Sequence, residues 1–127
     1  MSGRRVIVTG SRNLRIPEIG DLLAALDAEH ARDPIATIVQ GGATGADTTA
    51  RWWANKRGLQ CETYKAAWGQ YGLRAGPMRN TMMVADGADL VIAAPGGKGT
   101  ADCVKKARAA GIAVLDLADK AEAGGEA

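Results

Sequence analysis

The sequence of 127 residues contains no phenylalanine, only two cysteines and no long apolar run. Aliphatic side chains and alanine must therefore fill most of the core of the single domain that this length predicts. Cys61 and Cys103 lack the spacing of metal ligands, so we expect buried thiols rather than a metal site or a disulfide. Every apolar run is far shorter than the roughly 18 residues of a membrane-spanning helix. Val6-Ile7-Val8 is also too short for the core of a signal peptide. We expect a soluble, cytoplasmic protein with no membrane partner.

Neither sign of charge predominates, since the sequence contains 16 basic and 14 acidic residues. The net charge of +2 is too small to predict a nucleic-acid partner, and no long basic stripe or aromatic series is present for tracking a single strand. The sequence also lacks the Walker pattern Gly-x-x-x-x-Gly-Lys-Ser/Thr, and no Gly-x-Gly-x-x-Gly follows its first apolar run. ATP hydrolysis and ordinary NAD-dependent hydride transfer are therefore disfavoured, and no cofactor is predicted.

Apolar runs alternate with helical patterns along the chain. Continuous apolar runs without polar alternation indicate strands that are buried on both faces, as in parallel sheets. The strands are expected at residues 5–9, 35–40, 59–64, 89–94 and 112–117, and the helices at 17–31, 46–57, from Pro77 past Ala85, and 100–110. This alternation predicts an α/β fold over residues 1–117, a single Rossmann-like open parallel sheet of about five strands in the order 3-2-1-4-5, with helices on both faces. Strand 59–64 is the least apolar and should lie at an edge, and residues 118–127 should form a frayed tail.

Three glycine-bearing loops each follow a predicted strand: residues 9–12, 41–47 and 95–100. In open parallel sheets, ligands bind outside the carboxyl ends of the strands where the strand order reverses. The three loops are therefore predicted to line one crevice. Glycine allows backbone N–H groups to approach a phosphate closely, so loop 95–100, with Gly96, Gly97 and Gly99, is predicted to bind phosphate.

Several side chains near these loops carry alternative roles. Ser11 and Arg12 suit a phosphate or hydroxyl, and Arg79 is expected to close on the same anion, with Arg74 either joining it or remaining a surface residue. Thr100 would cap the following helix or bind a phosphate oxygen. Asp47 would accept ribose hydroxyls or cap the helix that begins near residue 46.

The sequence also predicts where the aromatic residues and methionines lie. In the irregular segment 66–76, Trp68 and Tyr71 would stack on a base or anchor the segment to the body of the protein. Of the adjacent Trp52 and Trp53, at most one should be well buried, and the other would mark a contact in a homodimer or higher oligomer. The methionines at 78, 82 and 83 are expected to pack into the core.

Four blocks of the sequence together resemble the YspA-type branch of the SLOG superfamily: residues 8–12, 40–47, 76–80 and 94–102. The resemblance covers nearly all of the chain apart from the last ten residues. It implies a Rossmann-like domain of a group associated with nucleotides and nucleotide-derived ligands. That group includes the LOG phosphoribohydrolases and the single-strand-binding domain of DprA.

The resemblance to LOG enzymes also raises a question of catalysis. These enzymes use an arginine and a glutamate of the motif Pro-Gly-Gly-x-Gly-Thr-x-x-Glu to release a base from a nucleoside monophosphate. The arginine matches Arg79, whereas the glutamate position is Cys103, which cannot replace a carboxylate. Asp102 lies one residue earlier, about 100° around the helix, so we expect it to point elsewhere. Asp47, Asp102 and Arg79 remain the candidates for catalysis.

The sequence therefore predicts a protein that binds a nucleotide or nucleotide-derived small molecule. The alternatives are a LOG-like hydrolase of nucleoside monophosphates and a DprA-like single-strand nucleic-acid binder. The predicted ligand-binding residues are Gly10, Ser11, Arg12, Gly41, Gly42, Thr44, Gly45, Asp47, Arg79, Asn80, Pro95, Gly96, Gly97, Lys98, Gly99 and Thr100.

Overall fold

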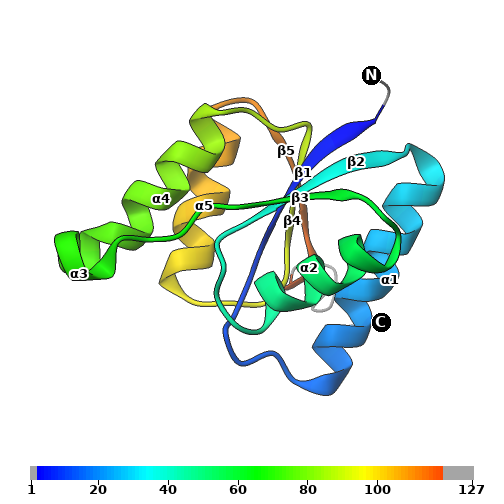
Figure 1. Ribbon diagram of the computed structural model, residues 1–127, viewed down its shortest axis with the longest axis horizontal. Coiled ribbons are helices and arrows are strands. Elements are labelled where there is room, and N and C mark those ends of the chain that lie inside the picture. The colour runs from blue at the N-terminus through cyan, green and yellow to red at the C-terminus, as the bar shows by residue number, and fades with distance from the viewer. Residues whose placement is uncertain (1–2, 119–127) are drawn as a thin grey trace.

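The computed structural model describes residues 3–118, in which five strands alternate with helices (Figure 1). The strands are β1 (Arg4–Thr9), β2 (Ile35–Gln40), β3 (Gln60–Thr63), β4 (Leu90–Ala93) and β5 (Ala113–Asp116). The helices are α1 (Ile16–Arg32), α2 (Ala46–Lys56), α3 (Trp68–Tyr71), the 3-10 turn η1 (Gly72–Arg74), α4 (Ala75–Ala85) and α5 (Lys98–Ala109). All strand pairs are parallel, in the order β3-β2-β1-β4-β5. The predicted α/β fold, strand order and edge position of β3 are confirmed.

Helices cover both faces of the sheet, with α1 and α2 on one side and α4 and α5 on the other (Figure 1). Alternate residues of β1 face the two layers, because successive side chains of a strand point to opposite faces. Val6 and Val8 pack with Leu22, Leu26 and Trp53 of α1 and α2. On the opposite face, Ile7 packs with residues of α4 and α5, among them Met83 and Cys103. Aliphatic residues thus supply most of the core, as the absence of phenylalanine predicted.

The adjacent tryptophans of α2 have opposite environments. Trp53 is 1% exposed and its indole N–H donates to Asp27 Oδ1 at 2.9 Å, whereas Trp52 is 52% exposed. The expectation that at most one of them is well buried is confirmed. A subunit contact at Trp52 stays a prediction.

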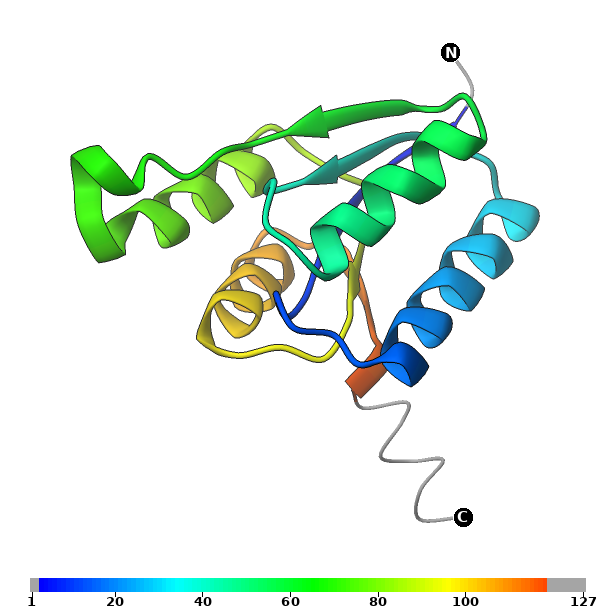
Figure 2. The same ribbon diagram turned by 60° about the horizontal axis from the view of Figure 1, so that its bottom comes forward.

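Two helices begin two residues earlier than the sequence predicted. Helix α4 begins at Ala75, two residues before Pro77, and α5 begins at Lys98, two residues before Thr100. Pro77 is tolerated because the first N–H groups of a helix have no intrahelical partner. The segment expected to be irregular contains α3 and η1, and α3 lies at the outer end of the molecule in both ribbon views (Figure 2).

The methionine prediction is only partly right. Met83 is 2% exposed, but Met78 and Met82 are 42% and 59% exposed. These two residues are four apart and share the outer face of α4, while Met83 lies about 100° further around the helix and faces the sheet.

Cys61 and Cys103 are both free thiols, and Cys103 is buried while Cys61 is partly buried. No helix among residues 3–118 combines the length and apolar character that crossing a membrane requires. The predicted tail lies outside the described residues except for Ala118, whose backbone N–H donates to Asp116 Oδ1.

Candidate functional site

The three glycine-bearing loops meet at the carboxyl ends of the central strands. The loop after β1 lies between the other two: Ser11 N donates to Pro95 O at 2.8 Å, and Ala46 N donates to Ser11 O at 3.1 Å. Thr44 Oγ1 also donates to Arg12 O at 3.0 Å. A Cβ at Gly10 would lie 2.8 Å from the Cβ atoms of both Ala46 and Ala94, so the close approach requires glycine there.

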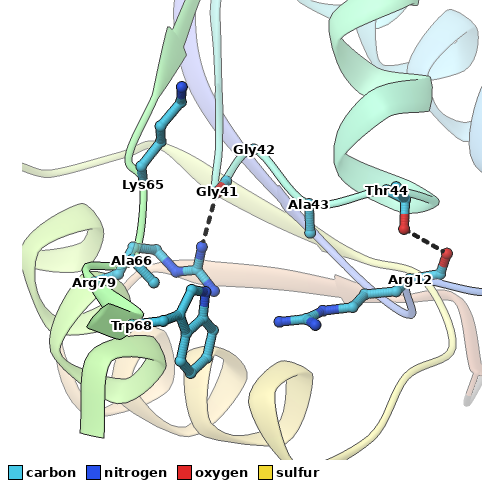
Figure 3. Close-up of a pocket in the computed structure, with 9 residues that line it drawn as sticks. All are labelled: Arg12, Gly41, Gly42, Ala43, Thr44, Lys65, Ala66, Trp68 and Arg79. Carbon is cyan, nitrogen blue, oxygen red and sulfur yellow. Dashed lines mark hydrogen bonds between the residues drawn. The ribbon is translucent and has the colours of Figure 1, made fainter. Parts of the chain in front are cut away.

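Three cavities open beside these loops. One, of about 410 Å³, is lined by Gly96, Gly97 and residues of α5 and β5, and the other two adjoin each other. The larger of these two, here called the main lobe, has a volume of about 610 Å³ and the smaller, the side lobe, about 360 Å³. Figure 3 shows the residues that line the side lobe. The two lobes share four lining residues, Arg12, Ala43, Trp68 and Arg79, and therefore form one two-lobed crevice.

Most of the predicted ligand-binding residues line this crevice. In the main lobe are Gly10, Ser11, Arg12, Asp47, Arg79, Asn80, Gly97, Lys98, Gly99 and Thr100. In the side lobe are Gly41, Gly42 and Thr44, together with Arg12 and Arg79. Gly45, Pro95 and Gly96 line neither lobe.

Those three residues shape the loops instead. Pro95 O accepts the hydrogen bond from Ser11. Gly45 has a φ of +74°, and a Cβ there would lie 2.2 Å from Ser11 O. A Cβ at Gly96 would lie 2.1 Å from Thr100 Oγ1. Backbone angle and packing therefore explain why glycine stands at positions 45 and 96, and Pro95 contributes its carbonyl to the contact between loops.

At Gly97 and Gly99, neither a positive φ nor packing requires glycine. Both line the main lobe, neither has a positive φ, and a Cβ at either would meet no atom within 4 Å. Gly99 also lies inside α5, where alanine is the better helix former. Open space beside backbone N–H groups at a helix N-terminus is what a bound phosphate requires.

The capping role considered for Thr100 is wrong. The N-cap of α5 is Gly97, so Thr100 is the third residue of the helix rather than its cap. Its hydroxyl lies against Gly96, and its side chain lines the main lobe.

Arg79 is held by its own surroundings. Its Nε donates to Asn80 Oδ1 at 2.9 Å and its Nη1 donates to Gly41 O at 2.9 Å, as the dashed line in Figure 3 marks. A Cβ at Gly41 would lie 2.0 Å from that Nη1, so glycine makes room for the guanidinium. The side chain is thereby fixed where the two lobes join.

Asn80 is a positioning residue whose role the sequence did not reveal. It is 2% exposed, and its Nδ2 donates to Gly99 O at 3.1 Å and to Asp102 Oδ2 at 3.0 Å. Together with the bond from Arg79, these contacts use the amide's donors and acceptor within the protein. Asn80 thus joins Arg79 of α4 to the first turn of α5.

Asp47 does not cap α2, because the N-cap of that helix is Gly45. Its Oδ2 accepts the backbone N–H groups of Gly41 and Ala43, each at 3.1 Å. Burial raises the pKa of Asp47, and these two amides and the nearby guanidinium of Arg79 oppose the shift. The carboxylate therefore organises the loop after β2, and it also lines the main lobe.

Cys103, at the expected glutamate position, is buried, whereas the neighbouring Asp102 reaches the crevice. Cys103 is fully buried, and burial raises the pKa of its thiol to about 11, so it is not a thiolate at neutral pH. Asp102 was expected to point elsewhere, but it lines the main lobe. It does so because Asn80 and Lys106 hold its Oδ2 over the seam between α4 and α5, at 3.0 and 2.9 Å.

Four basic and two acidic residues line the crevice, the acidic ones being Asp47 and Asp102. Arg12, Lys65, Arg79 and Lys98 line it, and none takes part in an ion pair formed within residues 3–118. Away from the two lobes, Arg4, Arg5, Arg15, Arg32, Arg57 and Lys106 are paired with carboxylates, whereas Arg51, Lys56, Arg74, Lys105 and Arg108 form no ion pair within residues 3–118. The crevice therefore presents an excess of positive charge.

Trp68 lines the crevice, whereas Tyr71 does not. Trp68 lines both lobes, and the Arg12 guanidinium lies 5.5 Å from its ring centroid. Neither Tyr71 nor Arg74 lines a lobe. Lys65 and Ala66, which were not predicted from the sequence, follow the carboxyl end of β3 and line the side lobe. Their position just after a strand was the signal available for finding them.

Comparison with known proteins places the chain among relatives. The model of a family described as "YAcAr: YspA, cpYpsA-related SLOG family" matches residues 4–71. The chain is also similar to the Gene 61 protein of Mycobacterium phage D29. Their identity is 39% over 125 residues, which cover 92% of this chain and 98% of that protein.

Two solved structures have a similar fold. One is DNA processing protein A (DprA) from Streptococcus pneumoniae, with a TM-score of 0.73 and 19% identity over 90% of this chain. This chain spans 50% of that DprA chain. The other is TM1055, with a TM-score of 0.66 and 20% identity, covering 87% of this chain and 72% of that one. These likenesses show a shared Rossmann-like α/β fold.

Proposed function

This chain belongs to the YspA, cpYpsA-related SLOG family, and from its crevice we propose that it binds a nucleotide or nucleotide-derived small molecule. A phosphate group of the ligand would lie against Gly97 and Gly99, at the N-terminus of α5. The observation that carries the proposal is the open space beside these two glycines, where neither a positive φ nor packing requires glycine. The helix N-terminus adds unpaired N–H groups and a positive partial charge.

The charge of the crevice supports an anionic ligand. Lys98 lies beside the proposed phosphate position, and Arg12 and Arg79 lie at the junction of the lobes. Guanidinium and ammonium groups without a carboxylate partner favour a phosphate, because arginine donates to it through two parallel N–H groups.

Calorimetric titration tests the proposal. The panel is AMP, ADP-ribose, NAD and cyclic nucleotides. We expect at least one member to bind, with an affinity that falls as salt is raised. Absence of binding by every member at millimolar concentration would overturn the proposal.

Trp68 offers an internal probe of binding. A ligand in the crevice should change the intrinsic fluorescence of this indole, which lines both lobes. We expect Trp68→Phe to remove most of the fluorescence change. Trp52→Phe serves as the matched control, because Trp52 is half-exposed on α2 and lines neither lobe. An equal loss of signal in both variants would contradict a ligand beside Trp68.

A second candidate function, hydrolysis of the glycosidic bond of nucleoside monophosphates, is favoured by one observation. Asp102 lines the main lobe and is linked through Asn80 to Arg79. Its carboxylate is the group that would stabilise a developing positive charge on the ribose or activate water.

Substitution of Asp102 separates this activity from binding alone. If the protein releases adenine from AMP, Asp102→Asn should slow the release by about 100-fold or more. Asp21→Asn, at an exposed position on α1, is the control and should not alter the rate. Release that survives both Asp102→Ala and Asp47→Ala would contradict the assignment, and absence of release by the wild-type protein would remove this candidate.

A further inference from the structure

The crevice has two lobes, and each is large enough to hold a ligand group. Pockets that hold a small molecule have volumes of about 300–1,000 Å³. The main lobe, at about 610 Å³, and the side lobe, at about 360 Å³, each fall within that range. A mononucleotide with its phosphate on Gly97 and Gly99 would use the main lobe and leave the side lobe without a ligand group.

The junction of the lobes, here called the waist, carries the two guanidinium groups that both lobes share. Figure 3 shows the side chains of Arg12 and Arg79 reaching toward Trp68 from opposite sides. Within residues 3–118, the Arg12 guanidinium has no hydrogen-bond acceptor, and Arg79 uses its Nε and Nη1 but not its Nη2. Unused N–H groups of two arginines, one from the loop after β1 and one from α4, are the donors that one phosphate group requires.

We propose that the crevice takes a linear dinucleotide with a terminal phosphate, an inference that rests on the proposed function and extends it. The terminal phosphate lies against Gly97 and Gly99, and the first nucleoside fills the main lobe. The linking phosphate lies at the waist between Arg12 and Arg79. The second nucleoside occupies the side lobe.

The walls of the crevice fit these assignments. Trp68, 44% exposed, presents an indole at the waist on which a base can stack. In the side lobe, Ala66 and the backbone of Gly41 and Gly42 supply small groups, and the Lys65 side chain extends away from Arg79 and Trp68 (Figure 3). The chain has a net charge of only +2 and no long basic stripe, which favours a short ligand over a long strand.

Three adenine probes separate the two phosphate positions. AMP has the terminal phosphate alone, ApA has the linking phosphate alone, and pApA has both. Calorimetry should show that pApA binds at least about tenfold more tightly than either AMP or ApA, as expected for an added charge-assisted contact. Longer oligomers, from four to ten nucleotides, should bind no more tightly than pApA.

Variants at the waist and in the side lobe locate the second half of the ligand. Arg12→Ala should weaken the binding of pApA by about tenfold or more and the binding of AMP by less than about threefold. The affinity of Arg12→Lys for pApA should lie between those of Arg12→Ala and the wild type. Ala66→Leu should weaken the binding of pApA but not that of AMP, because the leucine side chain fills the side lobe. Ala67→Leu is the matched control, since Ala67 is exposed and lines neither lobe.

The outcomes distinguish this inference from the proposed function. If neither AMP nor pApA binds at millimolar concentration, both fail. If AMP binds but pApA binds no more tightly, or if Arg12→Ala weakens both equally, the dinucleotide inference alone fails. An affinity that keeps rising from two to ten nucleotides would replace it with binding of a nucleic-acid strand.

Discussion

Replacing Asp47 with alanine should lower the free energy of unfolding by about 2–4 kcal/mol, because it leaves two backbone donors without an acceptor. Asp47 Oδ2 accepts the N–H groups of Gly41 and Ala43, and the Gly41 contact is buried. The variant would also leave the guanidinium of Arg79 without its nearest buried carboxylate. Urea unfolding monitored by circular dichroism measures the loss as a shift of the midpoint.

The Asp47→Asn variant isolates the charge from the hydrogen bonds, since an amide oxygen can accept from the same two N–H groups. Burial raises the pKa of Asp47 in the folded chain above its value in the unfolded chain. A group with a raised folded pKa contributes its full stability below the unfolded pKa and loses it as the pH rises through the folded pKa. Wild-type protein should therefore lose stability relative to Asp47→Asn as the pH rises above about 4.

Unfolding of both variants and the wild type at pH 4, 5.5 and 7 tests this sign. We expect the free energy of unfolding of Asp47→Asn to be close to that of the wild type at pH 4 and to exceed it increasingly at higher pH. The free energy of unfolding of Asp47→Ala should be lower than both at every pH. A gap that closes as the pH rises would show that the carboxylate is favoured in its ionised form. Equal stability of the Ala variant and the wild type would contradict the role of Asp47 in organising the loop.

The strand order and the meeting of the loops could be predicted from the sequence because both follow from general rules. Buried runs such as Val6-Ile7-Val8 and residues 90–93 indicate a parallel sheet, and parallel sheets place every following loop at one edge. Gly10, Ser11 and the loop of residues 41–47 were found in this way without knowledge of their contacts.

The orientation of Asp102 could not be predicted, because it depends on a helix packed alongside. An offset of one residue on α5 turns a side chain by about 100°. The cavity nonetheless includes Asp102, since Asn80 and Lys106 draw the carboxylate over the seam between α4 and α5. The start of α5 was misplaced by two residues for a related reason, because Gly99 disfavours a helix in isolation.

The distinction among the glycines of loop 95–100 also depends on the folded structure. In the sequence, Gly96, Gly97 and Gly99 are equivalent candidates for phosphate binding. In the structure, Gly96 is required by the packing of Thr100, whereas Gly97 and Gly99 face open space. The sequence pattern thus predicted the loop, and only the neighbours of each Cβ position separate the structural glycine from the two that a ligand explains.

Gly99→Ala should therefore abolish or weaken ligand binding by about tenfold or more while leaving the fold at least as stable as wild type. The added Cβ meets no protein atom within 4 Å, and alanine in a helix is favoured over glycine by up to about 1 kcal/mol. The same Cβ would occupy the space through which a phosphate approaches the backbone N–H groups. Calorimetry with AMP and urea unfolding of the same preparation measure the two effects.

Gly20→Ala is the matched control, because Gly20 lies inside α1, has no atom within 4 Å of a Cβ position and lines neither lobe. It should gain the same helical stability and bind as wild type does. Gly96→Ala should show the opposite pattern, a loss of stability caused by contact with Thr100. A variant that is more stable yet does not bind is difficult to explain by damage to the fold. Unchanged binding by both Gly97→Ala and Gly99→Ala would instead show that the phosphate does not lie on this loop.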